Sequence, residues 1–246
     1  MASGLYLYGI FPAPGPHNLQ ITGLDQQRVC DREIDGFVFL YSEAQQERYS
    51  ASRKNLLGHE QVLEYAMQQG FRTLLPLQFG LIIENWKIVK QQLITPKRQE
   101  LYQLFTKLTG RREVSIKLFW DFKQELNFLM QEDQAVRIER DRLEGKNLSI
   151  EEIIRIGQSI ERAMEQRKQE IITTVQHTLN PLAIELAENR LLTDAMIYNA
   201  AYLIPWDAET RFSEQVETID RQFEHRLLIR YNNFTAPFNF AHLDQN

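Results

Sequence analysis

After Arg112, strand-like and helix-like spacings of apolar residues follow one another in a definite order. This order limits the possible folds more than any other feature of the sequence. Glu113–Phe119 alternates polar and apolar residues, the pattern of a strand with one buried face. Apolar residues then recur every three or four positions as far as Leu186, which predicts long helical structure. Two apolar runs, one helix face and a short strand follow, at 189–192, 196–204, 212–223 and 226–231. The predicted order is strand, helix, strand, strand, helix, strand.

This order is the split βαβ, or ferredoxin-like, arrangement with an enlarged first helical connection. Both crossovers need helices, because the strands that they join would be parallel neighbours. Ser149 and Glu152 have the spacing of a capping box, which predicts a helix start. Pro181 is expected to break or kink the same helix, since proline donates no backbone hydrogen bond.

The residues before Gly110 predict a second mixture of strands and helices. Leu5–Phe11 and Phe37–Tyr41 have the composition of strands, and Thr95-Pro96 has that of a helix start. We therefore predict an α+β fold with two domains and an aromatic C-terminal tail. The first domain is a variant α+β domain and the second is ferredoxin-like; the three segments are residues 1–110, 111–231 and 232–246.

Composition narrows the class of protein. Hydrophobic residues make up 43% of the 246-residue chain, and its net charge is −5. An acidic balance argues against a nucleic-acid partner and weakens a role at a lipid membrane. Cys30 is the single cysteine, so the chain forms no internal disulfide and suits a reducing compartment. The apolar run near the N-terminus is too short for a signal peptide, so we expect a cytoplasmic protein.

The sequence contains no spacing typical of catalysis or metal binding. Phosphate-binding glycine loops, H-E-x-x-H, C-x-x-C and G-x-S-x-G are all absent from it. His59-Glu60 has no second histidine four residues after His59, and Cys30 has no evident base. We therefore predict no catalytic residue, no metal and no cofactor, and a protein that is not an enzyme.

Two apolar segments are unusual and become the candidate partner-binding sites. Leu74–Ile82 is broken by Pro76 and Gly80, which favours either a kinked core strand or an apolar partner surface. The aromatic tail either packs back on the protein or docks on a partner. The candidate residues of the two segments are Leu77, Phe79, Leu81, Ile82, Phe234, Pro237, Phe238 and Phe240.

Several motifs, in order along nearly the whole chain, resemble the GvpF/GvpL family of gas vesicle proteins. They are the opening strand Leu5–Ile10, the Leu-Pro-x-x-Phe-Gly pattern at Leu75–Gly80, the strand Glu113–Lys117, the strand Asn199–Ile204 and the pair Arg230-Tyr231 before an aromatic tail. The tail departs from the family pattern, because Asn232–Pro237 stands where the family often has Gly-Pro and further prolines.

The resemblance implies a minor structural or accessory protein that gas vesicle assembly requires. Such a protein binds the hydrophobic major shell protein and prevents its aggregation during nucleation. Its implied partners are that shell protein and other gas vesicle accessory proteins, and its implied location is in or on the protein shell. Two alternatives stay open: a ferredoxin-like enzyme, which would show a polar pocket with shifted pKa values, and an RNA-binding module.

Overall fold

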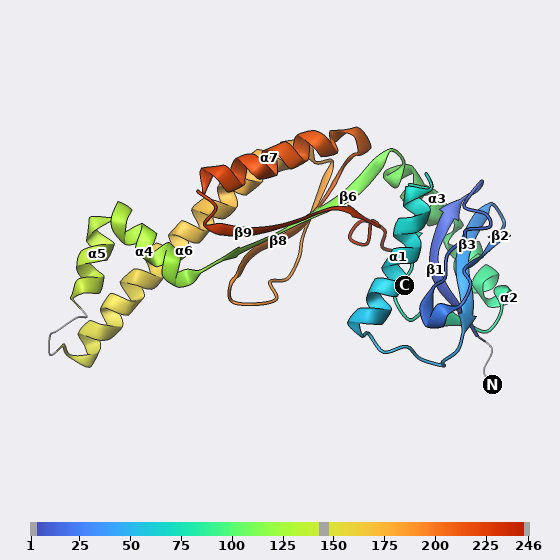
Figure 1. Cartoon of the computed structure of the whole chain (residues 1–246), viewed down its shortest axis with the longest axis horizontal. Coiled ribbons are helices and arrows are strands. Elements are labelled where there is room, and N and C mark those ends of the chain that lie inside the picture. The colour runs from blue at the N-terminus through green and yellow to red at the C-terminus, as the bar shows by residue number, and fades with distance from the viewer. Residues whose placement is uncertain (1–3, 143–147, 244–246) are drawn as a thin grey trace. The chain divides into compact units, whose positions relative to one another are not determined.

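The computed structural model describes residues 4–142 and 148–243 and has a mixed α+β fold with two sheets, as predicted. The chain forms two compact units, each built around one sheet (Figure 1). After Val114 the chain returns twice to the first unit. The first unit consists of Met1–Val114, Leu203–Asp207 and Asn233–Asn246, and the second of Ser115–Tyr202 and Ala208–Asn232.

The first sheet is organised around β1 (Gly4–Pro12). This strand pairs antiparallel with β3 (Phe37–Ala44) on one side, and with β4 (Leu75–Pro76) and β5 (Ile82–Ile83) on the other. At the outer edge, β2 (Cys30–Ile34) pairs antiparallel with β3. The segment between β4 and β5 therefore lies beside β1.

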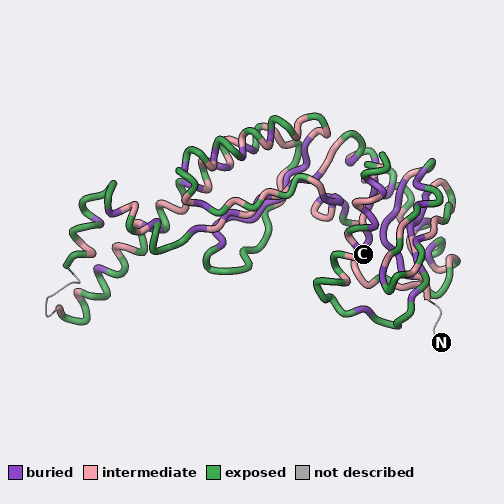
Figure 2. Tube along the Cα trace, viewed as in Figure 1, coloured by how far each residue is buried: buried purple, intermediate pink, exposed green. Residues whose placement is uncertain are grey.

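Both faces of this sheet are covered by helices, and Figure 2 shows its strands as largely buried. On one face α1 (Arg53–Gln68) contributes to the same apolar cluster as Val38 and Leu40 of β3. On the other face, Phe37 lies 5.9 Å from the ring of Phe105. The continuous apolar run of β3 follows from this burial on both sides.

The second helix layer is continuous across the predicted start at Thr95-Pro96. It comprises α2 (Trp86–Val89), a π-helical turn at Lys90–Ile94 and α3 (Thr95–Leu108). α3 begins at Thr95 with Pro96 in its first turn, as the sequence predicts, but Ile94 rather than Thr95 occupies the N-cap position and is itself helical. A wide π turn just before Pro96 changes the local hydrogen-bond pattern, and the helix continues despite the missing proline N–H.

The second sheet has the strand order β7-β8-β6-β9. Every second side chain of β6 from Val114 to Trp120 is buried, which confirms the predicted alternation. Among its neighbours, β8 is buried along nearly its whole length. The four strands are β6 (Arg111–Trp120), β7 (Glu185–Glu188), β8 (Met196–Pro205) and β9 (Leu227–Thr235).

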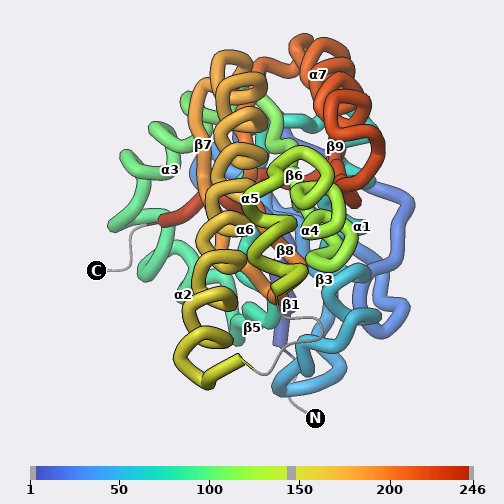
Figure 3. Tube along the Cα trace, turned by 90° about the vertical axis from the view of Figure 1, so that its left-hand side faces the viewer, coloured from blue at the N-terminus to red at the C-terminus, as the bar shows by residue number. Residues whose placement is uncertain are grey.

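In the described part of the chain, four α-helices accompany this sheet, and α6 is the longest of them. α4 and α5 lie beside the N-terminal part of α6, whereas α7 contacts α6 further along (Figures 1 and 3). Ser149 forms the predicted capping box with Glu152, and α6 ends before Pro181 in a 3₁₀ turn. The helices are α4 (Phe122–Glu132), α5 (Gln134–Asp141), α6 (Ile150–Leu179) and α7 (Glu209–Gln222).

Two predicted strands in this part of the chain have different bounds in the structure. The run at 189–192 is not a strand; β7 precedes it, and Leu191 and Leu192 lie exposed in the connection to β8. The final strand continues beyond 231 to Thr235, so the first residues of the predicted tail belong to β9. In the described ranges, every helix is too short or too polar to cross a lipid bilayer.

Candidate functional site

The segment between β4 and β5 is fixed along β1 by backbone hydrogen bonds. Leu77 N–H donates to the Tyr8 carbonyl at 2.9 Å, and Leu7 N–H donates to the Leu81 carbonyl at 3.0 Å. Gly80 has a φ of +88°, a conformation that side-chain-bearing residues rarely adopt. The bend that Pro76 and Gly80 predict is therefore present, and it places Phe79 and Leu81 next to the first sheet.

A buried pair of side chains, Tyr6 and His59, holds this bend through hydrogen bonds. The Tyr6 hydroxyl and His59 Nδ1 share a hydrogen bond of 2.8 Å, and Gly80 N–H donates to the same hydroxyl at 3.1 Å. Burial lowers the pKa of His59 to about 4, although a backbone hydrogen bond with Leu77 acts in the opposite direction. Burial also raises the pKa of Tyr6. Both groups are therefore neutral near pH 7 and act as a structural anchor rather than as an acid–base pair.

The C-terminal tail packs against the same anchor. Ala236 and Phe240 are buried, and Phe238 packs against the apolar cluster of the first unit. The ring of His59 lies 5.9 Å from that of Phe79 and 6.4 Å from that of Phe238. His59 thus brings together one aromatic residue from each of the two candidate segments.

The eight candidate residues differ in how much surface they offer. Leu81 is exposed, at 36% of its full accessibility, and is the most accessible of the eight. A buried side chain holds the surface in place but offers little area to a partner. Partly buried residues are Phe79, Ile82, Phe234 and Phe238, and buried residues are Leu77, Pro237 and Phe240.

A buried carboxylate fastens the tail within the first unit. Glu113 is only 3% exposed, and its two oxygens accept hydrogen bonds from Asn239 N–H at 2.8 Å and from Asn239 Nδ2 at 2.6 Å. Burial raises the pKa of Glu113 to about 7; the bonds from Asn239 oppose this shift, and the nearby Glu60 adds to it. The ionisation of Glu113 is therefore placed near neutral pH.

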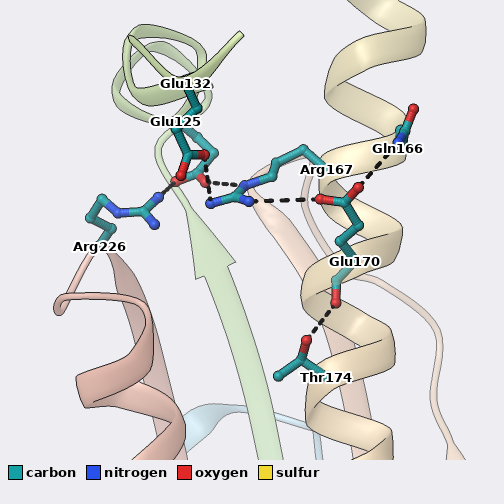
Figure 4. Close-up of polar contacts among 7 residues, drawn as sticks. All are labelled: Glu125, Glu132, Gln166, Arg167, Glu170, Thr174 and Arg226. Atoms are coloured by element: carbon teal, nitrogen blue, oxygen red, sulfur yellow. Dashed lines mark hydrogen bonds and ion pairs between the residues drawn. The ribbon is translucent and has the colours of Figure 1, made fainter. Parts of the chain in front are cut away.

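In the second unit, a second buried carboxylate lies between two guanidinium groups (Figure 4). Arg167 Nε donates to Glu125 Oε1 at 2.9 Å, and Arg226 donates to Glu125 Oε2. The guanidinium of Arg226 also lies 3.5 Å from the ring centre of Phe128. A buried charge that is paired on both sides links α4 and α6 to the residue just before β9, which is a structural role.

The second unit also contains an open groove of about 1030 Å³ beside α6. Gly157, Ile160 and Met164 form part of one wall, and Leu191 and Leu192 part of the other. The described residues of its lining include neither histidine nor cysteine. Within the described ranges, no cluster of three or more potential metal ligands occurs. The lining combines apolar side chains with a charged rim in about equal measure, an arrangement that suits an amphipathic protein segment.

The predicted site residues do not include this groove. Ile150, Ile153 and Ile154 have the spacing of a helix face, and that spacing alone gave no reason to separate them from the core residues later in α6. The one available signal for an exposed surface was the length of the apolar helix face, which is longer than a short sheet can cover. No local signal marks Glu113, because its burial depends on residues far away in the sequence.

Known proteins resemble the chain over nearly its whole length. The family described as "Gas vesicle synthesis protein GvpL/GvpF" matches residues 4–242. The chain belongs to this family of gas vesicle proteins. Gas vesicle protein F from a Nostoc species is 57% identical over 243 residues, covering 99% of this chain and all of the relative. Gas vesicle protein F from Dolichospermum flosaquae is 55% identical over 244 residues, with the same coverage.

Solved structures of the family have the same fold. The crystal structure of GvpF from an Anabaena species matches with a TM-score of 0.89 at 56% identity, covering 99% of this chain and all of that chain. The structure of GvpF from Microcystis aeruginosa matches with a TM-score of 0.83 at 55% identity, covering 98% of this chain and all of that chain. The predicted family is therefore correct. It is a gas vesicle protein family rather than an enzyme family, and it points to partners within the gas vesicle system.

Proposed function

We propose that this chain is a minor structural and accessory protein of gas vesicles that binds the hydrophobic major shell protein. In this proposal it keeps the shell protein from aggregating while a vesicle nucleates, acts in or on the protein shell in the cytoplasm, and is not an enzyme. The match of residues 4–242 to the gas vesicle family carries the proposal. Apolar side chains at the surface of both units support it.

The first-unit contact in this proposal is the bend around Gly80 together with the tail. Leu81 offers the most accessible apolar side chain there, with Phe79 and Phe238 beside the His59 anchor. Buried candidates such as Leu77 and Phe240 hold these residues in position. Because the bend is fixed by hydrogen bonds, it presents a preformed surface, which lowers the entropic cost of binding.

We further propose that the second unit is a ferredoxin-like domain with an enlarged first connection. Its chain order of strand, helices, strand, strand, helix and strand supports this assignment, as does the order β7-β8-β6-β9 in its sheet. The enlargement is the helical segment α4 to α6, which lies between the first two strands.

Co-expression of the tagged chain with the major shell protein tests the proposed function. We expect soluble shell protein to be retained on the tagged chain and to precipitate when the chain is absent. Leu81→Ser should weaken retention, whereas the matched change Leu228→Ser at an exposed position of β9 should not. If the chain occurs only on floating vesicles, it is a late shell component without a solubilising role. If it is absent from both fractions, the proposal is overturned.

A further inference from the structure

The apolar stripe of α6 continues beyond the part of the helix that the second unit buries. Met164, Ile171 and Val175 are buried, with at most 2% of their surface exposed. Near the start of the same helix, the stripe stands in solvent. There, Ile150 is 77% exposed, Ile153 48% and Ile154 54%.

The groove beside α6 opens onto this exposed stripe. Its helix wall contains Gly157, about one turn after Ile153 and Ile154, so stripe and groove form one surface. Exposed apolar residues outside α6 form its other side. We call this surface the α6 groove; its apolar members are Ile150, Ile153, Ile154, Gly157, Ile160, Met164, Trp120, Phe122, Leu191 and Leu192.

Gly157 gives the α6 groove a notch that admits another backbone. A Cβ atom built on Gly157 would meet nothing within 4 Å. The glycine is therefore not required by packing within this chain, although glycine in a helix interior costs roughly 0.5–1 kcal/mol relative to alanine. A small residue on an apolar helix stripe allows a second helix to approach closely, with its ridges in the grooves of the first.

The length and charge of the α6 groove define its occupant. From Ile150 to Met164 the helix rises about 21 Å, or about four turns of a partner helix. The rim carries three carboxylates, on Glu161, Glu165 and Asp194, against the cations of Lys168 and Arg190. Lys168 already pairs with Glu165 at 2.9 Å. Among the described residues, Glu161, Asp194 and Arg190 form no ion pair, which leaves the rim with a net charge of −1, so an occupant with a basic flank is complementary.

We propose that the α6 groove binds an amphipathic helix of the major shell protein, one that carries lysine or arginine on the flank facing Glu161 and Asp194. The inference rests on the proposed function, since it takes its partner from there, and it adds the partner's binding element and the surface that receives it. The helix buries its apolar stripe over Gly157 and between α6 and the 191–192 connection.

Co-purification of shell protein with tagged variants tests the inference. Gly157→Trp fills the notch and should reduce retained shell protein about tenfold, whereas the matched change Gly157→Ala should leave retention unchanged. Glu161→Lys should reduce retention several-fold. Glu217→Lys, on an exposed position of α7, makes the same change in net charge away from the groove and should have no effect.

A second change protects the test from a folding defect. Ile153→Ser with Ile154→Ser alters two exposed side chains, so circular dichroism and the melting temperature should stay close to those of the unchanged protein while retention falls. A photo-crosslinking amino acid in place of Ile154 should label shell-protein residues three or four positions apart, the spacing of a helix face.

The outcomes separate the inference from the proposed function. If the unchanged chain retains shell protein and both the Gly157→Trp and the double serine variants retain it equally, the α6 groove is overturned and the proposed function stands. Cross-links at every second residue would overturn a helical occupant in favour of a strand. If the unchanged chain retains no shell protein, the proposed function fails, and this inference fails with it.

Discussion

Replacing Glu113 by glutamine isolates the free energy of burying a carboxylate under the C-terminal tail. Burial raises the pKa of Glu113 to about 7 from an ordinary value of 4.5. Because the folded pKa is the higher one, the folded state binds more protons than the unfolded state between these values. The free energy of unfolding therefore falls as pH rises through this window. The contribution is fully present below pH 4.5 and is lost above about pH 7.

The size of the effect follows from the shift. Each pKa unit corresponds to about 1.36 kcal/mol, so this shift corresponds to about 3 kcal/mol. Glutamine has nearly the same shape and does not ionise in this range. The free energy of unfolding of the natural protein, minus that of Glu113→Gln, should therefore fall by about 3 kcal/mol between pH 4.5 and pH 8. The remaining groups titrate in both proteins, so the difference reports on Glu113.

Urea denaturation followed by tryptophan fluorescence, at several pH values across this window, measures the difference. Glu47→Gln is the matched control, because it makes the same chemical change at an exposed position in the same unit. Two parallel curves for the natural protein and Glu113→Gln would refute the reasoning. They would mean that the bonds from Asn239 stabilise the ionised carboxylate as strongly as burial destabilises it.

Three further changes test the anchors of the two units. Glu125→Ala leaves two partly buried guanidinium groups without their shared carboxylate and should cost about 3–5 kcal/mol in urea denaturation; a loss under 1 kcal/mol would contradict a stabilising ion cluster. Tyr6→Phe removes the hydroxyl shared by His59 and Gly80 and should cost about 1–3 kcal/mol by the same measurement, and an unchanged stability would show that water replaces it. Ser149→Ala should cost about 1 kcal/mol through loss of the capping box, seen as a lower melting temperature by circular dichroism; equal melting would show that the cap is energetically neutral.

The elements that the sequence predicts well are those whose partners lie nearby in the chain. The alternation along β6 and the capping box of α6 depend on spacings of two and three residues, and both are present. The end of α6 before Pro181 follows from a missing backbone donor. Such features need no knowledge of distant segments.

The predictions that failed depend on contacts that periodicity does not encode. The apolar pair Leu191 and Leu192 suggests a strand, but these residues stand exposed after β7 has ended. Asn199 instead organises the connection, because its side-chain amide donates to the Arg190 carbonyl at 2.9 Å and its own carbonyl accepts from Asn189 N–H at 2.7 Å. A hydrophobic run indicates residues that are buried in most proteins. It does not show whether the same chain or a binding partner buries them.

Glu113 shows the same limit for the candidate site. The alternation along β6 assigns it to the polar face, where a carboxylate would normally be solvated and would titrate near 4.5. The tail changes its surroundings completely, because Asn239, 126 positions later, covers it and donates to both oxygens. When the tail packs against the first unit, the Glu113 carboxylate loses its contact with water. The position of Phe238 and Phe240 is therefore coupled to the charge of Glu113. The aromatic tail therefore contributes to the apolar core of the first unit and also sets the pKa of Glu113. A change that weakens tail packing lowers that pKa, and ionisation of Glu113 in turn weakens tail packing.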